Sequence, residues 1–296
     1  MDIYNEKFLH PGEDNPVKEH YKDFYDTVFI AFSPFFKIKD NAVINPDFQK
    51  SHIISFDEAK EAIPILKKIP QLNASIYSYH NNNYPTEKQI LENGISVPWD
   101  DIRQSCDFKS YSDIYKALRT SIGGYKQVFM RADLSNRLLD FTKSNQIFIP
   151  TEGHFETLSK IKLLKAFQLL DKKTIVVEDE FYEKKTEIDI TNISNEKFVE
   201  ALAFKDYYVY DTDKQLLFAV GWDDFFFLIC SNKDSLKKIN DNLNFEGFYC
   251  NDNTELGWEL TKEERKEGLD KENKQNVLPA KNPWWKVWKY FDRNIF

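Results

Sequence analysis

The stretch from residue 206 to residue 231, DYYVYDTDKQLLFAVGWDDFFFLICS, decides the fold class. It contains three runs of aromatic, β-branched and aliphatic residues, at 207–210, 216–220 and 225–230, which have the composition of strands. Polar turn residues separate these runs, first at 211–213 and then at 221–224. Turns this short join antiparallel strands, so we predict a three-stranded meander.

Amphipathic helices are predicted before and after this meander. The strongest pattern covers 154–171, where apolar side chains form one broad face. Ser55 with Glu58, and Thr86 with Gln89, have the spacing of a capping box, which marks the start of a helix. Shorter patterns of helical spacing occur at 59–66, 87–93, 114–122, 134–141, 196–203 and 235–243.

Further strands are predicted outside the meander. Residues 23–39 are rich in aromatic and β-branched residues and are interrupted by Pro34, which predicts an extended segment broken by a turn. Strands are also predicted at 146–149 and 174–177, residues 188–193 partly alternate, and 125–131 fits either a strand or a helix. The predicted class is α+β, with an antiparallel meander in the C-terminal half packed by helices from the middle of the chain.

The composition narrows the classes of function. The chain has 40 Lys+Arg against 48 Asp+Glu, a formal net charge of −8, and no long basic run, so we expect no nucleic-acid partner. The longest apolar run, 225–230, is too short for a transmembrane segment, and the acidic N-terminus lacks the features of a signal peptide. Cys106, Cys230 and Cys250 are widely spaced, which fits reduced thiols. We therefore expect a cytoplasmic protein.

The aromatic residues also mark the C-terminus. The chain contains 25 Phe, 15 Tyr and 6 Trp, and several of them lie in the final segment WWKVWKYFDRNIF. Trp284, Trp288, Phe291 and Ile295 form one stripe at helical spacing. We expect this stripe to bind the body of the same chain or a sister subunit, with a foreign partner protein and a membrane surface as alternatives.

Four parts are predicted along the chain. They are a polar N-terminal extension at 1–22, a single α+β domain at 23–258, a charged tether at 259–282 and the aromatic tail at 283–296. Residues 261–276 of the tether contain one large apolar residue, Leu269, so this segment is expected to be a solvated helix or linker.

Residues whose side chains could take part in catalysis or ligand binding are dispersed along the chain. Each of them also has a purely structural interpretation. Helix starts, solvated helix faces, turns and strand ends explain them without a metal, a cofactor or a catalytic group. The alternatives are an acid/base or magnesium site, an anion site and a polar site beside Trp222. The residues in question are His154 near Glu152, Arg119, Arg131 and Arg137 around Gly123 and Gly124, Asp223 and Asp224, and Glu178, Asp179 and Glu180.

Three stretches carry a resemblance to a known family. RTSIGGYKQVFMR at 119–131, DYYVYDTDKQLLFAVGWDDFF at 206–226 and EGFYCNDNTELGW at 246–258 resemble a YwbB-like family of bacterial proteins of unknown function, found mainly in firmicutes. The resemblance covers about residues 94–258. It implies a cytoplasmic setting and transfers no activity or site residues, and the charged tether and aromatic tail lie outside it.

A second similarity points to a class of function. A helix followed by a meander with an aromatic-Asp turn, in an acidic chain, is similar to SUKH-type immunity proteins, which bind and neutralise toxins. That resemblance implies a basic toxin as partner.

The residues themselves favour a non-enzymatic binding or interaction protein. The alternatives are a SUKH-like toxin-immunity protein and an enzyme with a dispersed site near His154 and residues 119–131. A concave pocket joining those residues would favour the enzyme, and a flat exposed face of aromatic and acidic residues would favour the binding protein.

Overall fold

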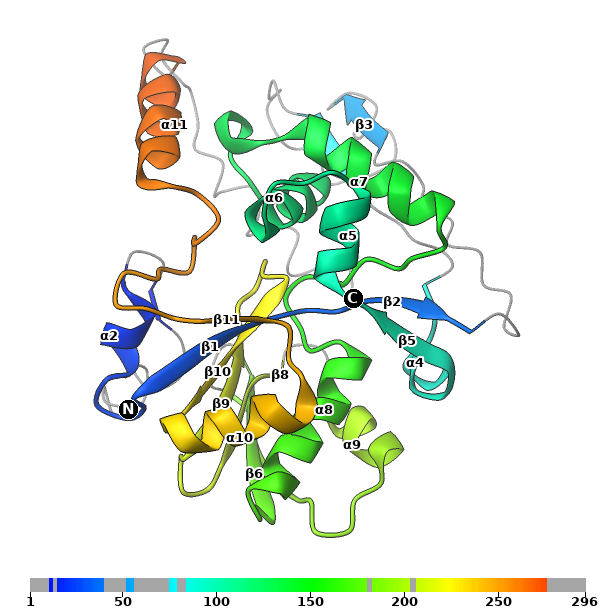
Figure 1. Ribbon diagram of the computed structural model, residues 1–296, viewed down its shortest axis with the longest axis vertical. Helices are drawn as coiled ribbons and strands as arrows, with labels where there is room; N and C mark the ends of the chain where they lie inside the picture. The colour runs from blue at the N-terminus through cyan, green and yellow to red at the C-terminus, as the bar shows by residue number, and fades with distance from the viewer. Residues whose placement is uncertain are drawn as a thin grey trace.

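A seven-stranded antiparallel sheet lies at the centre of this protein (Figure 1). The computed structural model describes residues 11–12, 15–39, 52–55, 75–78, 84–179, 183–202 and 206–275. From one edge of the sheet to the other the strands are β11 (Gly247–Tyr249), β1 (Thr27–Phe32), β10 (Phe226–Ser231), β9 (Leu216–Val220), β8 (Asp206–Asp211), β6 (Thr174–Asp179) and β7 (Lys185–Asp189). The predicted α+β class is confirmed.

The predicted meander forms strands β8, β9 and β10. Tyr210 lies opposite Leu217 in the first pair, and Val220 lies opposite Phe227 in the second. The carboxylate of Asp211 closes the first turn by accepting hydrogen bonds from the backbone N–H groups of Gln215 and Leu216, at 2.8 and 2.7 Å. The second turn contains Gly221 to Asp224, as predicted.

Strands β9 and β10 are buried on both faces along their whole length. On one face, Phe218 and Phe227 pack against Phe167 and Phe155, each at 5.4 Å between ring centroids. Phe167 belongs to helix α8 (Thr157–Leu169), and Phe155 lies two residues before its start. On the other face, Phe226 contacts Tyr115 of helix α6 (Tyr111–Ser121) and Trp258. Side chains alternate between the faces of a strand, so continuous apolar runs at these positions require cover on both sides.

The segment 23–39 connects the main sheet to a second, smaller one. It forms β1 and then β2 (Phe35–Ile38), which pairs with β5 (Gly94–Val97), and the predicted break falls at Pro34. The fully buried Trp99 fixes this break, because its indole Nε1 donates a 2.8 Å hydrogen bond to the carbonyl of Ser33 and its ring stacks on Phe32 at 4.3 Å.

The remaining elements surround these sheets. Figure 1 shows α8 and α10 beside the sheet in the lower half of the molecule, and α5, α6 and α7 grouped in the upper half. A two-stranded pair, β3 (His52–Ser55) and β4 (Ser75–Ser78), is separate from both other sheets. The helices not yet named are α2 (Val17–Tyr21), α4 (Glu87–Asn93), α5 (Trp99–Ser105), the 3-10 helix η2 (Gln127–Phe129), α7 (Ala132–Ser144), α9 (Asn195–Ala201), α10 (Lys233–Leu243) and α11 (Lys262–Gln275).

Most predicted helices are present with shifted limits. The capping box of α4 is complete, with the Thr86 hydroxyl accepting from the Gln89 N–H and the Gln89 side chain accepting from the Thr86 N–H. Helix α8 begins at Thr157 rather than at residue 154, since the carboxylate of Glu156 accepts a 2.6 Å hydrogen bond from the Thr151 N–H and closes a loop at 151–156. Residues 125–131, which fitted either class, contain η2.

Two strand predictions were wrong in detail. Residues 146–149 form no strand, because their contact with β2 is a single bridge between Phe148 and Phe36. The strand predicted from the alternation at 188–193 is β7, which lies at 185–189, because its pairing with β6 places Ile188 opposite Ile175 and ends with Asp189 opposite Thr174.

Several predictions lie outside the described residues. These are the helix at 59–66 and the aromatic tail with Trp284, Trp288, Phe291 and Ile295. Residues 262–275 form α11, one of the two predicted states of the charged segment, while the division of the chain into four parts stays a prediction. In the described part of the chain, no helix has the length and apolarity needed to cross a membrane.

The two environments of tryptophan give a test of this packing. We expect Trp99→Ala to lower the free energy of unfolding by about 3 to 5 kcal/mol, because it empties a fully buried site and removes the hydrogen bond to Ser33. Trp222→Ala, at a 41% exposed position, should cost less than about 1 kcal/mol. Chemical denaturation of both variants checks this, and equal losses would contradict the packing described.

Candidate functional site

The turn between β9 and β10 brings together residues that are far apart in the sequence. The backbone N–H of Gly153 donates a 3.0 Å hydrogen bond to the carbonyl of Asp224. Gly153 has φ +71°, and a Cβ at this position would lie 1.9 Å from the carbonyl oxygen of Trp222. The loop that carries His154 therefore lies directly against the turn that carries Trp222.

Arg119 of α6 holds the same turn from another side. Its Nη1 donates a 2.8 Å hydrogen bond to the carbonyl of Asp223 and lies 3.6 Å from the Asp223 carboxylate. Its Nη2 donates at 2.6 Å to the carbonyl of Gly124, and the guanidinium lies 5.4 Å from the centroid of the Tyr125 ring. A planar guanidinium with several fixed donors can hold a turn and a helix end simultaneously.

Two tyrosines, the buried Tyr115 and the half-buried Tyr125, complete the arrangement. The hydroxyl of Tyr115 donates a 2.6 Å hydrogen bond to the carboxylate of Asp224, and the hydroxyl of Tyr125 donates at 2.5 Å to the carboxylate of Glu259. Burial raises the pKa of both hydroxyls above the ordinary value, so both stay protonated donors. Glu259 is itself only 5% exposed.

We call Glu152, His154, Trp222, Asp223 and Asp224 the Trp222 surface. Trp222 is exposed, and the other four side chains are partly buried. Burial raises the pKa of Glu152 above its ordinary value, although the nearby His154 lowers it. The Nδ1 atom of His154 lies 3.2 Å from the carbonyl oxygen of Glu152. This surface therefore combines three carboxylates with one exposed aromatic side chain.

The structure changes the interpretation of several charged residues. Arg119 was expected on a solvated helix face, but its side chain is 19% exposed, and its Nη1 and Nη2 atoms donate to the backbone carbonyls of Asp223 and Gly124. Arg131 pairs with Asp133, and Arg137 donates to the carbonyls of Cys106 and Asp107.

The acidic strand end also differs from its interpretation. Glu178 was expected to be solvated, but it is buried. Its carboxylate accepts a 2.9 Å hydrogen bond from the Tyr210 hydroxyl and lies 3.6 Å from the Lys185 ammonium, and these contacts offset the cost of burying the charge. Asp179 accepts hydrogen bonds from the backbone N–H groups of Glu183 and Lys184, and Glu180 lies outside the described residues.

Sequence reasoning missed Tyr115, Tyr125 and Glu259. Tyr115 reads as an ordinary core residue of a helix, and Glu259 lies in the segment taken as a tether. The Tyr125–Glu259 hydrogen bond joins residues 134 positions apart, so no local spacing could reveal it.

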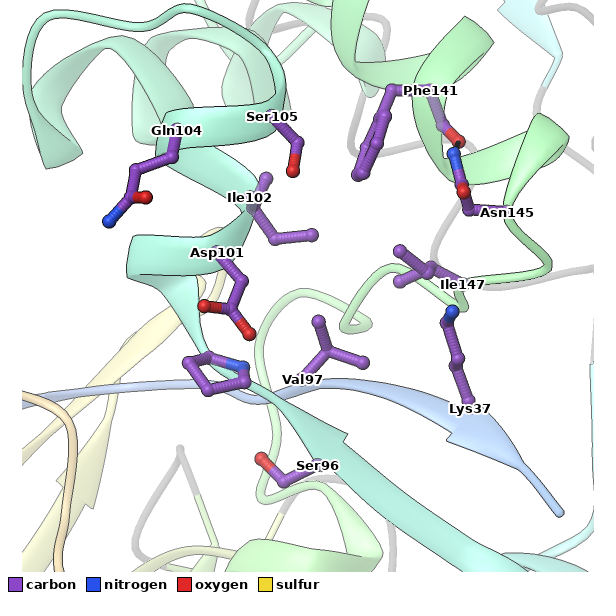
Figure 2. A pocket seen from close by; sticks show the side chains of 11 residues that line it. Lys37, Ser96, Val97, Asp101, Ile102, Gln104, Ser105, Phe141, Asn145 and Ile147 are labelled. Carbon is purple, nitrogen blue, oxygen red and sulfur yellow. Dashed lines mark hydrogen bonds between the residues drawn. The ribbon is translucent and has the colours of Figure 1, made fainter.

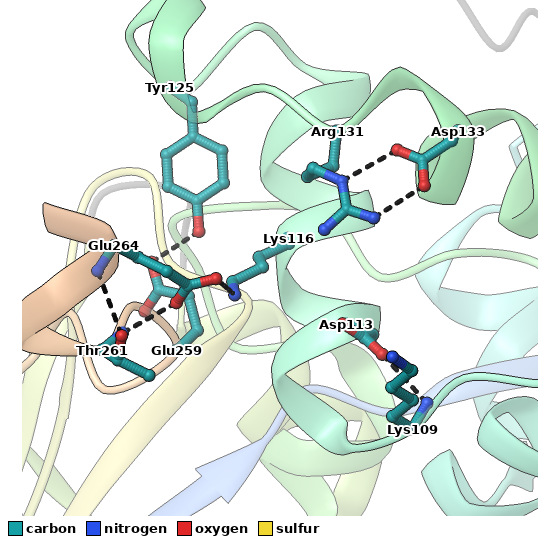
Figure 3. Close-up of polar contacts among 9 residues, drawn as sticks. All are labelled: Lys109, Asp113, Lys116, Tyr125, Arg131, Asp133, Glu259, Thr261 and Glu264. Atoms are coloured by element: carbon teal, nitrogen blue, oxygen red, sulfur yellow. Dashed lines mark hydrogen bonds and ion pairs between the residues drawn. The ribbon is translucent and has the colours of Figure 1, made fainter. Parts of the chain in front are cut away.

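Helix α11 is attached to the domain beside this arrangement, as Figure 3 shows. The ammonium of Lys116 lies 2.6 Å from the carboxylate of Glu264. Glu264 also caps its own helix, because its carboxylate accepts from the Thr261 N–H at 2.8 Å while the Thr261 hydroxyl accepts from the Glu264 N–H. The charged segment thus makes specific contacts in its first turn.

A pocket of about 390 Å³ lies elsewhere, between β2, β5, α5 and the end of α7 (Figure 2). Val97, Ile102, Phe141 and Ile147 form its apolar lining. Its polar lining residues include Lys37, Asp101, Ser96 and Ser105. None of these residues was singled out as a site residue from the sequence, because they come from three separate stretches, at 37, 96–105 and 141–147.

The described residues offer little for metal or thiol chemistry. Among them, no group of three or more His, Cys, Asp or Glu side chains is arranged to hold a metal ion. All three cysteines are buried and free, and burial raises the pKa of Cys250 to about 12. A thiol with so high a pKa forms little thiolate at neutral pH.

Comparisons with known proteins give a family and a relative. A family model described as "Protein of unknown function (DUF2711)" matches residues 13–260. Over 186 residues the chain is 23% identical to "Uncharacterized protein YwbB" of Bacillus subtilis (strain 168), a match that covers 63% of this chain and 82% of that protein. No solved structure matches the chain significantly. The YwbB-like resemblance is confirmed.

The contact at Gly153 predicts a large effect of one methyl group. We expect Gly153→Ala to lower the free energy of unfolding by at least about 2 kcal/mol, because the backbone has positive φ and the new Cβ would overlap the Trp222 carbonyl. The control Gly12→Ala meets only the Asn15 side chain at 3.5 Å and should cost less than about 1 kcal/mol. Thermal and chemical unfolding measure both, and a stable Gly153→Ala protein would refute the contact.

The opposite pKa shifts of Glu259 and Glu264 predict that these two residues contribute to the stability of the fold with opposite pH dependences. Burial raises the pKa of Glu259 above its ordinary value, although the hydrogen bond from Tyr125 opposes this shift. Burial also favours a higher pKa for Glu264, but the hydrogen bond from Lys116 outweighs it, so the pKa of Glu264 lies below its ordinary value. A raised folded-state pKa gives stability at low pH that is lost as pH rises through it, and a lowered one gives stability at higher pH that is lost on acidification.

Two variants, each with one of these glutamates replaced by glutamine, test the two pH dependences separately. Between about pH 4 and pH 7, the stability of the native chain relative to Glu259→Gln should fall, and its stability relative to Glu264→Gln should rise. Urea denaturation at several pH values measures both differences. Parallel pH profiles for the two variants would show that one of the two environments is wrong.

Proposed function

The chain belongs to the DUF2711 family of proteins of unknown function, and we propose that it is a non-enzymatic binding protein. On this proposal the Trp222 surface binds a positively charged protein. The proposal is supported by the geometry of the β9–β10 turn and by the charges that border it.

The observation that carries the proposal is an exposed tryptophan on a turn that is fixed in place. Trp222 is exposed to solvent, while the backbone of its turn accepts hydrogen bonds from Gly153 and Arg119. The carboxylate of Asp224 in the same turn accepts a hydrogen bond from Tyr115. A rigid aromatic side chain loses little conformational entropy on binding, and Trp is enriched at the energetic centres of protein interfaces. The turn therefore presents its indole already positioned.

The charge of this surface selects the partner. Asp223 and Asp224 follow Trp222 in the turn, Glu152 lies close enough to Asp223 to interact with it electrostatically, and Arg119 contacts the turn at Asp223. The whole chain carries a formal net charge of −8. Opposite charge accelerates encounter and excludes like-charged proteins, so a basic partner fits this surface.

The enzyme alternative draws on the same residues. The His154 loop and Arg119 do meet at one turn, and Glu152 has a raised pKa. However, Arg119 and Tyr115 hold the turn through hydrogen bonds, which would have to break before either group reached a substrate. The pocket of about 390 Å³ lies at other residues, so binding accounts for the arrangement better.

Two narrower proposals fit within this one. A toxin-immunity role, which the SUKH-type similarity implies, would make a basic toxin the partner. The stripe of Trp284, Trp288, Phe291 and Ile295 remains a proposed interaction segment, which would bind the chain itself, a sister subunit or the partner.

Affinity capture with the full chain tests the proposal. Proteins captured from an extract of the source organism are identified for the native chain, for Trp222→Ala and for Tyr249→Ala, a control with a similarly exposed aromatic side chain outside the Trp222 surface. We expect a basic protein whose affinity falls about 30-fold or more with Trp222→Ala and is unchanged with Tyr249→Ala. Its binding should weaken as salt is added.

A partner that is acidic, or that binds Trp222→Ala as tightly as the native chain, would refute the proposed surface. A chain truncated after residue 276 forms a further arm. If the truncated chain loses the partner while Trp222→Ala keeps it, the aromatic tail is the binding segment and the Trp222 surface is not.

A further inference from the structure

The pocket between β2 and α5 has a built apolar lining. Val97 belongs to β5 and Ile102 to α5, Phe141 lies near the end of α7, and Ile147 lies in the segment after α7. Figure 2 shows the Phe141 ring and the aliphatic side chains directed toward the same space. Ile102 and Ile147 are almost completely buried, so the floor of the pocket is part of the core.

Exposed apolar surface continues this lining. Ile95 of β5 is 49% exposed, and it lies directly opposite Lys37 in the β2–β5 pair. Ile95 and Val97 are two residues apart on one strand, so their side chains share a face of the small sheet. A ligand in the pocket therefore has apolar surface both below it and beside it.

Lys37 and Asp101 supply opposite charges at this pocket. Neither side chain has a hydrogen bond or ion pair with any residue that the structure describes. The neighbouring acid behaves differently, since Asp100 accepts hydrogen bonds from the side chains of Arg103 and Gln104. In Figure 2 the carboxylate of Asp101 lies on the α5 side and the ammonium of Lys37 on the side of Ile147.

We propose that this pocket binds a small zwitterion with an apolar side chain, with its carboxylate on Lys37 and its ammonium on Asp101. An α-amino acid and a short peptide with free termini share this chemistry. Separated charges of opposite sign fix the direction of such a molecule, and the apolar lining receives its side chain. The hydroxyl of Ser105 lies in the same lining and adds hydrogen-bonding capacity.

The size of the pocket limits the ligand. Small-molecule pockets commonly have volumes of roughly 300 to 1,000 Å³. At about 390 Å³ this pocket lies near the lower limit, which suits an amino acid or dipeptide better than a dinucleotide. The inference does not depend on the proposed partner, because the pocket and the Trp222 surface are built from different residues.

Calorimetric titration of the full chain tests the proposal. The probes are phenylalanine, leucine, the dipeptide leucyl-phenylalanine, N-acetyl-phenylalanine and phenylalanine amide. We expect the native chain to bind at least one zwitterion, and we expect blocking either terminus to weaken binding about 10-fold or more. The free amino acids and the dipeptide distinguish the two sources of this chemistry.

Four variants assign the direction of the ligand. Amidation of the ligand should no longer matter in Lys37→Gln, and acetylation should no longer matter in Asp101→Asn. The controls Lys39→Gln and Asp140→Asn change the same charges at exposed positions outside the lining and should keep the full discrimination. Failure of every zwitterion to bind, or blocked probes that bind the native chain as tightly, would overturn the proposal.

Discussion

The architecture depends on the burial of β9 and β10 from both sides. Every side chain of these two strands is covered, so one layer of the protein must lie on each face of the sheet. Phe155 and Phe167 cover one face at α8, and Tyr115 and Trp258 cover the other. A strand pair without cover on one face would expose several large aromatic groups to water, at a free-energy cost of about 1.5 to 3 kcal/mol for each.

The same constraint explains why polar groups gather at one end of the sheet. The strands end at the Trp222 turn, where apolar cover stops and backbone groups need partners. Arg119 and the Gly153 N–H supply donors to the turn carbonyls, and Tyr115 supplies one to Asp224. Charged and hydroxyl side chains are thus used here as structural partners, which leaves the indole as the part of the turn that faces outward.

Local sequence patterns predicted most helices and strands, but they could not predict contacts between residues far apart in the sequence. The meander, the capping box at Thr86 and the break at Pro34 were predictable because each is decided within a few residues. The role of Arg119 depends on a turn about 100 residues later, and that of Tyr125 on Glu259. The pocket is built from β2, β5, α5 and α7, whose relative positions no periodicity encodes. Residues 146–149 had the composition of a strand but form only a single bridge, between Phe148 and Phe36.

The order of strands in the sheet has a consequence for synthesis of the chain. Strand β1 lies between β10 and β11, so its two neighbours are made last while it is made first. At ordinary rates of translation, roughly 10 to 40 s separate the emergence of β1 from that of β10. Through that interval a ribosome-bound chain carries an apolar strand without either of its sheet partners. This topology therefore excludes stepwise folding of the sheet from the N-terminus, and it exposes the nascent strand to aggregation until the last strands are made.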